Sequence, residues 1–152
     1  MKKFLNYLIS IAIPVAVGAI VGVIMANFID YEVLKQPPLA PPQILFPIMW
    51  TILYIIMGIS YGILRDKGLL DKKSNVLYFA QLVVNALWSI IFFIWKLRLL
   101  AILWIVLLAV LVIAMIIDFI KKNKAAGLLQ IPYICWTSFA TYLTIAFYVL
   151  NK

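Results

Sequence analysis

The stretch LLAILWIVLLAVLVIAMII, residues 99–117, decides what kind of fold this chain can adopt. It holds 19 consecutive residues without a charge, and the Trp104 indole is its only polar side-chain group. At about 1.5 Å rise per residue, a helix of this length crosses a hydrocarbon core about 30 Å thick. We therefore expect this stretch to span a membrane.

Four further stretches share this property, and charged residues bound each of them. The five charge-free stretches are Phe4–Ile29, Gln36–Leu64, Ser74–Trp95, Leu99–Ile117 and Ala125–Asn151. A backbone inside lipid has to satisfy its own hydrogen bonds, and the alternating segments typical of a membrane β-barrel are absent, so helices are expected. We predict an all-α integral membrane bundle, one domain over residues 1–152, with five transmembrane helices at about 4–29, 43–64, 75–95, 99–117 and 127–150.

The first stretch follows Met1-Lys2-Lys3, a beginning that a secretory signal would also have. Its apolar run continues to Ile29, well beyond the roughly 7–15 residues of a signal core, and four more spans follow. We therefore interpret it as a retained first helix.

The charged residues gather in the short segments between the expected helices. The chain is 67% hydrophobic and carries 13 Lys and Arg against 5 Asp and Glu, a net charge of +8. Nine of the basic residues fall at the N-terminus and in the second and fourth loops, and four on the opposite side. The positive-inside rule then predicts a cell-membrane protein with a cytoplasmic N-terminus and an outside C-terminus. Such residues contact lipid headgroups, so membrane lipid is the expected partner and nucleic acid is not.

Several kinds of catalytic and metal site are excluded by what the chain lacks. It has no His, no acidic residue in a predicted span, and a single cysteine, Cys135. Metal sites, Ser-His-Asp or Cys-His nucleophiles and a carboxylate proton relay therefore lack their residues. We expect no metal and no cofactor, and acid–base enzyme chemistry is disfavoured.

Polar and aromatic residues recur at helical spacing on three of the expected helices. The three stripes are Trp50, Tyr54 and Tyr61; Gln81, Asn85, Trp88 and Phe92; and Trp136, Phe139, Ala140, Leu143 and Phe147. If these faces meet, they enclose an aromatic cavity suited to a large, flat ligand. Interfacial belts and contacts between helices would use the same residue types, and periodicity alone modestly favours that alternative. Residues 99–117 lack such a stripe, so we expect them to face lipid or another subunit.

Two short motifs suggest what the helices contact, one a neighbouring helix and the other a sterol. The patterns Gly18–Gly22 and Gly58–Gly62 allow close helix contact, either within the chain or in a homodimer. Leu143, Tyr148 and Lys152 fit a short sequence pattern that has been proposed for sterol contact.

Three longer segments, in order, carry a family resemblance over nearly the whole chain. The matching residues are Tyr31, Leu34, Pro37, Pro41, Pro42, Pro47, Trp50, Leu53, Tyr54 and Gly58; then Gln81, Leu82, Asn85, Trp88, Phe92 and Phe93; then Pro132, Tyr133, Trp136, Phe139, Ala140 and Leu143. Together they resemble the motifs of the translocator protein family, also called tryptophan-rich sensory proteins or peripheral-type benzodiazepine receptors.

This resemblance implies a five-helix bundle, often dimeric, with a ligand pocket closed by a lid at residues 30–42. The implied ligands are tetrapyrroles such as protoporphyrin IX, isoquinoline carboxamides and benzodiazepines. The implied pocket residues are Tyr31, Pro41, Trp50, Tyr54, Asn85, Trp88, Trp136, Phe139 and Ala140. A receptor or sensor is the function expected first. The alternatives are light-dependent porphyrin degradation, with Trp50 and Trp136 as the reactive pair, and transport of tetrapyrroles or other lipophiles.

The chain departs from the family pattern at three positions. Asp30 stands where the family has Trp, Gln36 where it has Lys, and Thr144 where Asn is common. Because the first two lie in the expected lid, we expect gating there to differ in strength. Thr144 adjoins the sterol motif and weakens that hypothesis.

Overall fold

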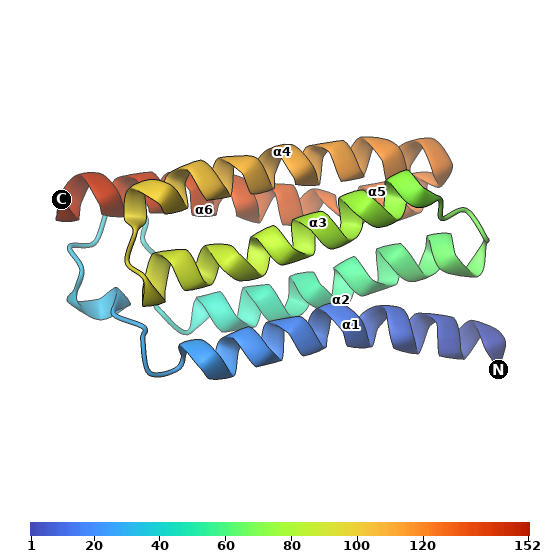
Figure 1. The fold of residues 1–152 in the computed structure, drawn as a ribbon, viewed down its shortest axis with the longest axis horizontal. Coiled ribbons are helices and arrows are strands. Elements are labelled where there is room, and N and C mark those ends of the chain that lie inside the picture. Colours follow the sequence, from blue (N-terminus) through green and yellow to red (C-terminus); the bar gives the residue numbers. More distant parts are fainter.

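The computed structural model describes residues 1–152 and contains helices and no strand. The chain has five long helical segments. They lie side by side, with the N-terminus at one end of the bundle and the C-terminus at the other (Figure 1). The elements are α1 (Lys2–Met25), η1 (Tyr31–Val33), α2 (Leu45–Asp66), α3 (Lys72–Ser89), η2 (Ile90–Ile94), α4 (Arg98–Lys122), α5 (Lys124–Leu128) and α6 (Ile131–Asn151). The predicted all-α fold is confirmed.

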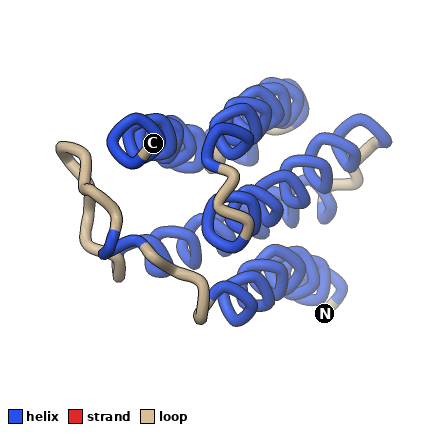
Figure 2. Tube along the Cα trace, turned by 60° about the vertical axis from the view of Figure 1, so that its left-hand side comes forward, coloured by secondary structure: helices blue, strands red, loops and turns tan.

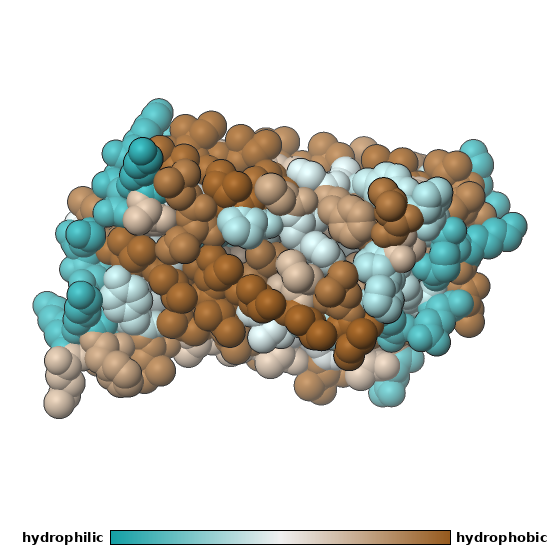
Figure 3. Space-filling model, turned by 180° about the vertical axis from the view of Figure 1, so that it is seen from behind, coloured by the Kyte–Doolittle hydropathy of each residue, from teal (hydrophilic) through white to brown (hydrophobic).

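The outside of the bundle is apolar, as a membrane requires. Five helical segments are long and apolar enough to span a bilayer, with η2 continuing α3 and α5 leading into α6. Large apolar side chains such as Leu103 and Val110 are 65% and 58% exposed along them. Figure 3 shows the resulting band of hydrophobic surface between two hydrophilic ends. A surface of this kind is stable in lipid rather than in water, so the chain is a multi-pass membrane protein.

Most helix boundaries lie close to the predicted ones, and local chemistry explains them. α1 ends at Met25, short of the predicted residue 29, and α2 begins at Leu45. At the start of α3, the Asp71 carboxylate accepts a hydrogen bond of 2.8 Å from the Ser74 amide, which caps the helix. Pro132 lies in the first turn of α6, where its missing amide hydrogen is tolerated.

The end of α4 corrects one expectation. The helix continues past residue 117 to Lys122, so Asp118 lies inside a spanning segment and is only 6% exposed. Its carboxylate accepts a hydrogen bond of 2.6 Å from the Ser74 hydroxyl and lies 3.4 Å from Lys122 Nζ. A paired carboxylate can be buried, and this cluster ties the start of α3 to the end of α4.

The helices form a ring in the order α1, α2, α6, α4, α3, with each helix contacting the next. Figure 2 shows this arrangement from nearer the end of the bundle. α4 lies between α3 and α6 and buries one full face, which includes Ala101, Ile105 and Leu108. The expectation that this helix faces lipid therefore holds for its exposed side, which includes Leu103 and Val110, whereas its other side packs inside the bundle.

Close packing of α1 against α2 accounts for most of the glycine patterns. A β-carbon on Gly58 would lie 2.7 Å from the Ser10 carbonyl oxygen, and one on Gly62 would meet the Tyr7 ring. A β-carbon on Gly18 would likewise overlap the Tyr54 ring, whereas Gly22 faces open space. Three of the four glycines therefore serve contacts within the chain.

Candidate functional site

The predicted lid folds back over one end of the ring. Tyr31 begins the short helix η1 and is 4% exposed, with its hydroxyl donating a hydrogen bond of 2.5 Å to the Pro41 carbonyl. Its ring packs edge-on against Phe46 of α2 and Phe147 of α6, at centroid distances of 5.0 and 5.2 Å. Burial raises the pKa of the Tyr31 hydroxyl, so it stays a neutral donor. Tyr31 thus fixes the lid to the helices that it covers.

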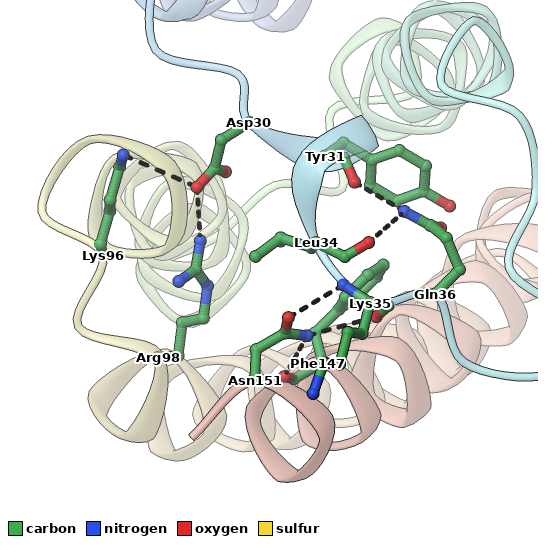
Figure 4. A network of polar contacts seen from close by, with 9 residues as sticks. All are labelled: Asp30, Tyr31, Leu34, Lys35, Gln36, Lys96, Arg98, Phe147 and Asn151. Carbon is green, nitrogen blue, oxygen red and sulfur yellow. Dashed lines mark hydrogen bonds and ion pairs between the residues drawn. The ribbon is translucent and has the colours of Figure 1, made fainter.

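Polar contacts at its edges hold the lid in place (Figure 4). Asp30 forms an ion pair of 2.8 Å with Arg98 at the start of α4, and Lys96 approaches the same oxygen to 3.6 Å. The Asn151 side chain of α6 accepts a hydrogen bond from the Lys35 amide and donates one to the Lys35 carbonyl. Two departures from the family pattern have structural roles here: Asp30 makes the ion pair, and Gln36 donates to the Tyr31 carbonyl at 2.6 Å.

Beneath the lid, aromatic rings from α2 and α6 form a continuous cluster. Trp50 stacks on Tyr54 at 5.8 Å and meets the Trp136 ring edge-on at 6.4 Å. Trp136 in turn contacts Phe46 at 5.9 Å and Phe139 at 5.6 Å. Spacing by one helical turn places these rings on one face of each helix. Two of the three stripes therefore meet.

Deeper in the bundle, a hydrogen-bonded network joins α2, α3 and α6. The Tyr54 hydroxyl donates to Asn85 Oδ1 at 2.9 Å, and Asn85 Nδ2 donates to the Tyr133 hydroxyl at 2.7 Å. Tyr133 donates in turn to Gln81 Oε1 at 2.7 Å, and all four side chains are buried. The stripe on α3 is therefore joined to α2 and α6 by polar contacts, through Tyr54 and Tyr133.

The space between the lid and this network is almost filled by side chains. A cavity of about 20 Å³ remains, room for about one water, whereas ligand pockets commonly measure about 300–1,000 Å³. Its lining residues are Tyr31, Phe46, Trp88, Phe92, Phe93, Ala140, Leu143, Thr144 and Phe147. A macrocycle would therefore have to displace several of these rings to occupy this space.

Two buried indole groups at this site have no hydrogen-bond partner. Trp88 and Trp136 are 6% and 8% exposed, and neither Nε1 has an acceptor. A buried donor without an acceptor costs about 1–3 kcal/mol, and natural structures contain few of them. An acceptor group on a bound ligand could satisfy either donor.

The structure gathers the sequence-predicted residues around one centre. Tyr31, Trp88 and Ala140 line the cavity, Pro41 holds the Tyr31 hydroxyl, and the others belong to the aromatic cluster or the network. Sequence reasoning missed Phe46 and Tyr133 as site residues. Tyr133 lies beside Pro132 in a quoted motif, and Phe46 precedes Trp50 by one helical turn, so the spacing of the first stripe could have found it.

The sterol-pattern residues are divided between two places. Leu143 is 4% exposed and lines the aromatic cavity, while Tyr148 and Lys152 line a separate groove on the outside of the bundle. The three side chains therefore do not form a single surface.

Comparison with known proteins agrees with the geometry. Residues 10–150 match the TspO/MBR family. The tryptophan-rich protein TspO of Chlorobaculum tepidum is 38% identical over 124 residues, which cover 80% of this chain and 78% of that protein. Protein CrtK of Rhodobacter capsulatus is 35% identical over 99% of this chain and 94% of its own length. The translocator protein of Bos taurus is 31% identical over 74% of this chain and 69% of its own.

Proposed function

Because this chain belongs to the TspO/MBR family of membrane sensory and translocator proteins, we propose that it is a receptor for tetrapyrroles such as protoporphyrin IX. The same site would take flat, drug-like isoquinoline carboxamides or benzodiazepines. The ligand would lie between α2, α3 and α6, beneath the lid that Tyr31 anchors.

The unpartnered indole donors carry this proposal. Trp88 and Trp136 offer buried N–H groups beside aromatic rings, which suits a large π-system bearing carboxylate or carbonyl acceptors. The site holds no acidic side chain that would repel a porphyrin carboxylate. Because the rings of the cluster contact one another without polar bonds, a ligand can replace ring–ring contacts with its own.

Binding in the dark tests the proposal. Protoporphyrin IX would be titrated with the purified chain, and the porphyrin absorbance would report binding. We expect saturation, and a Trp136→Phe variant should bind about tenfold more weakly, because it loses a donor and part of a stacking surface worth about 1.4 kcal/mol together. Trp95→Phe is the matched control, since Trp95 is 56% exposed and lies outside the site. Binding without saturation, or equal weakening in both variants, would contradict a defined pocket.

The contact between Trp50 and Trp136 favours light-dependent porphyrin degradation as a second candidate. Their rings meet at 6.4 Å, so two indoles would adjoin a bound macrocycle. Under illumination, porphyrin loss in a Trp50→Phe/Trp136→Phe variant would be compared with loss in Trp95→Phe. An equal rate per bound porphyrin would refute this candidate.

The charge distribution supports a proposed orientation in the cell membrane. The end of the bundle that holds the N-terminus carries nine of the 13 Lys and Arg residues, and the lid end carries four. We therefore place the N-terminus in the cytoplasm and the lid and C-terminus outside. Alkaline phosphatase fused after Lys152 should be active, and an inactive fusion would reverse the assignment.

A further inference from the structure

A groove of about 390 Å³ lies on the outside of the bundle at the lid end, where the turn between α3 and α4 meets the end of α6. It shares no lining residue with the aromatic cavity and is far larger. Its lining includes Lys96, Leu97, Arg98, Leu99, Tyr148 and Lys152. Its volume falls in the range of small-molecule sites.

The groove is positively charged. Three of its lining side chains are cationic and none is acidic. Asp30 of the lid pairs with Arg98 and Lys96 from outside the groove, while Lys152 forms no ion pair. The Nε of Arg98 is buried without an acceptor. The three cationic side chains outnumber the one acidic side chain that pairs with two of them, and a bound anion would offset the difference.

The other wall of the groove is apolar and continues onto the membrane-facing surface of α4. Leu97 and Leu99 are 50% and 57% exposed, and farther along the helix Leu103 and Val110 are also exposed. Trp95 and Tyr148 flank the cations, the residue types that gather at the level of lipid headgroups. The groove therefore combines a cationic mouth with an apolar surface that leads into the hydrocarbon.

We propose that this groove binds an anionic phospholipid. The phosphate would lie between Lys96, Arg98 and Lys152, and an acyl chain would follow the exposed face of α4. Free phosphate would leave the apolar wall unused, and an uncharged sterol would leave the cations unneutralised. The chemistry of both walls together therefore selects a lipid with a negative headgroup.

Lipid-dependent fluorescence quenching tests the proposal. The full chain would be reconstituted in phosphatidylcholine vesicles that contain increasing fractions of phosphatidylglycerol with brominated acyl chains. Bromine quenches indoles in contact, and the exposed Trp95 adjoins Lys96. Brominated phosphatidylcholine in the same vesicles gives the reference from which a preference for the anionic lipid is calculated.

The variant Lys96→Gln/Lys152→Gln removes two charges from the groove. Its matched control, Lys72→Gln/Lys73→Gln, removes two charges from exposed lysines at the other end of the bundle. We expect the first variant to lose at least about fivefold of its preference for phosphatidylglycerol, the effect of one lysine at a membrane surface. The control should keep its preference within about twofold. If the double variant misfolds by near-UV circular dichroism, Lys152→Gln alone replaces it, since Lys152 has no partner in the fold.

Three results would overturn the proposal. Equal loss in both variants would indicate diffuse surface charge. Displacement of the brominated lipid by inorganic phosphate, at ionic strength matched with sodium chloride, would assign the groove to free phosphate. Stronger quenching by a brominated sterol than by phosphatidylglycerol, unchanged in the variant, would assign it to a neutral lipid.

Discussion

The contact of α1 with α2 gives the sharpest test of this structure, through the variant Gly58→Ala. The added methyl carbon would lie 2.7 Å from the Ser10 carbonyl oxygen and 3.0 Å from the Ile11 amide nitrogen. Comfortable contacts are about 3.5–4.0 Å, so the two backbones would have to separate by roughly 1 Å. Both opposing groups are backbone, and neither can move aside as a side chain can.

The expected magnitude follows from two opposing effects. Forcing a methyl group into a well-packed contact costs about 1–3 kcal/mol, while replacing glycine by alanine inside a helix gains up to about 1 kcal/mol. At the upper end of that cost, Gly58→Ala should lose about 2 kcal/mol of unfolding free energy, whereas Gly22→Ala, with no atom within 4 Å, should gain up to about 1 kcal/mol.

The free energy of unfolding of both variants is measured in mixed micelles. Sodium dodecyl sulfate serves as the denaturant, and near-UV circular dichroism is the signal. The two changes add the same atoms to glycines in spanning helices, so their difference isolates packing from helix propensity. If Gly58→Ala is as stable as Gly22→Ala, α1 and α2 do not cross as described.

Three further predictions concern the network, one helix end and the lid. Asn85→Leu keeps the side-chain volume but removes one hydrogen-bond partner from each of the buried Tyr54 and Tyr133 hydroxyls. The free energy of unfolding in micelles should therefore fall by about 1–3 kcal/mol, and an unchanged value would contradict the network. Hydrogen bonds from the Lys122 ammonium and the Ser74 amide lower the pKa of Asp71 to about 2. The stability that the ionised Asp71 carboxylate contributes should therefore be lost as pH falls from about 4 to 2. Asp71→Asn keeps a side chain that can cap the helix but removes the charge, so its melting temperature should change less between pH 4 and 2 than that of the original chain. The same pH dependence in both proteins would refute the pairing of Asp71 with Lys122. Asn151→Ala should speed amide hydrogen exchange in residues 30–42 and leave α3 unchanged, and slow exchange in the lid would contradict the anchor.

The sequence predicted the inward faces of α2, α3 and α6 because hydrocarbon gives polar groups no partner. Asn85 and the indole of Trp136 had to lie inside, and their helical spacing showed which faces would meet. The same reasoning failed for α4. Both the buried Ile105 and the exposed Leu103 are apolar, since lipid and protein core accept the same side chains. Burial in a membrane therefore leaves no periodic signal in such a helix.

Other features depended on contacts between distant segments. The charges at residues 118–124 indicated a helix end, yet α4 continues through Asp118, because Ser74 and Lys122 satisfy its carboxylate. The family departure at Asp30 was visible in the sequence, but its partner Arg98 lies 68 residues away. Phe46 contacts two rings that are far away in the sequence, Tyr31 of the lid and Trp136 of α6.

The closed cavity and the network together indicate where the proposed ligand would make room. Below the cavity, Asn85 and its tyrosine partners are joined by buried hydrogen bonds, and separating them would leave polar groups unpaired in a medium without water. Above it, the rings of Phe46 and Phe147 contact Tyr31 by edges alone and can rotate without breaking a hydrogen bond. The less costly movement is therefore in the ring layer under the lid. Three polar links hold the lid over that layer: Asp30 pairs with Arg98 of α4, Lys35 bonds to Asn151 of α6, and the Pro38 carbonyl accepts from the Tyr142 hydroxyl of α6. The proposed ligand would therefore enter by breaking these links and turning the rings, while the network stays intact.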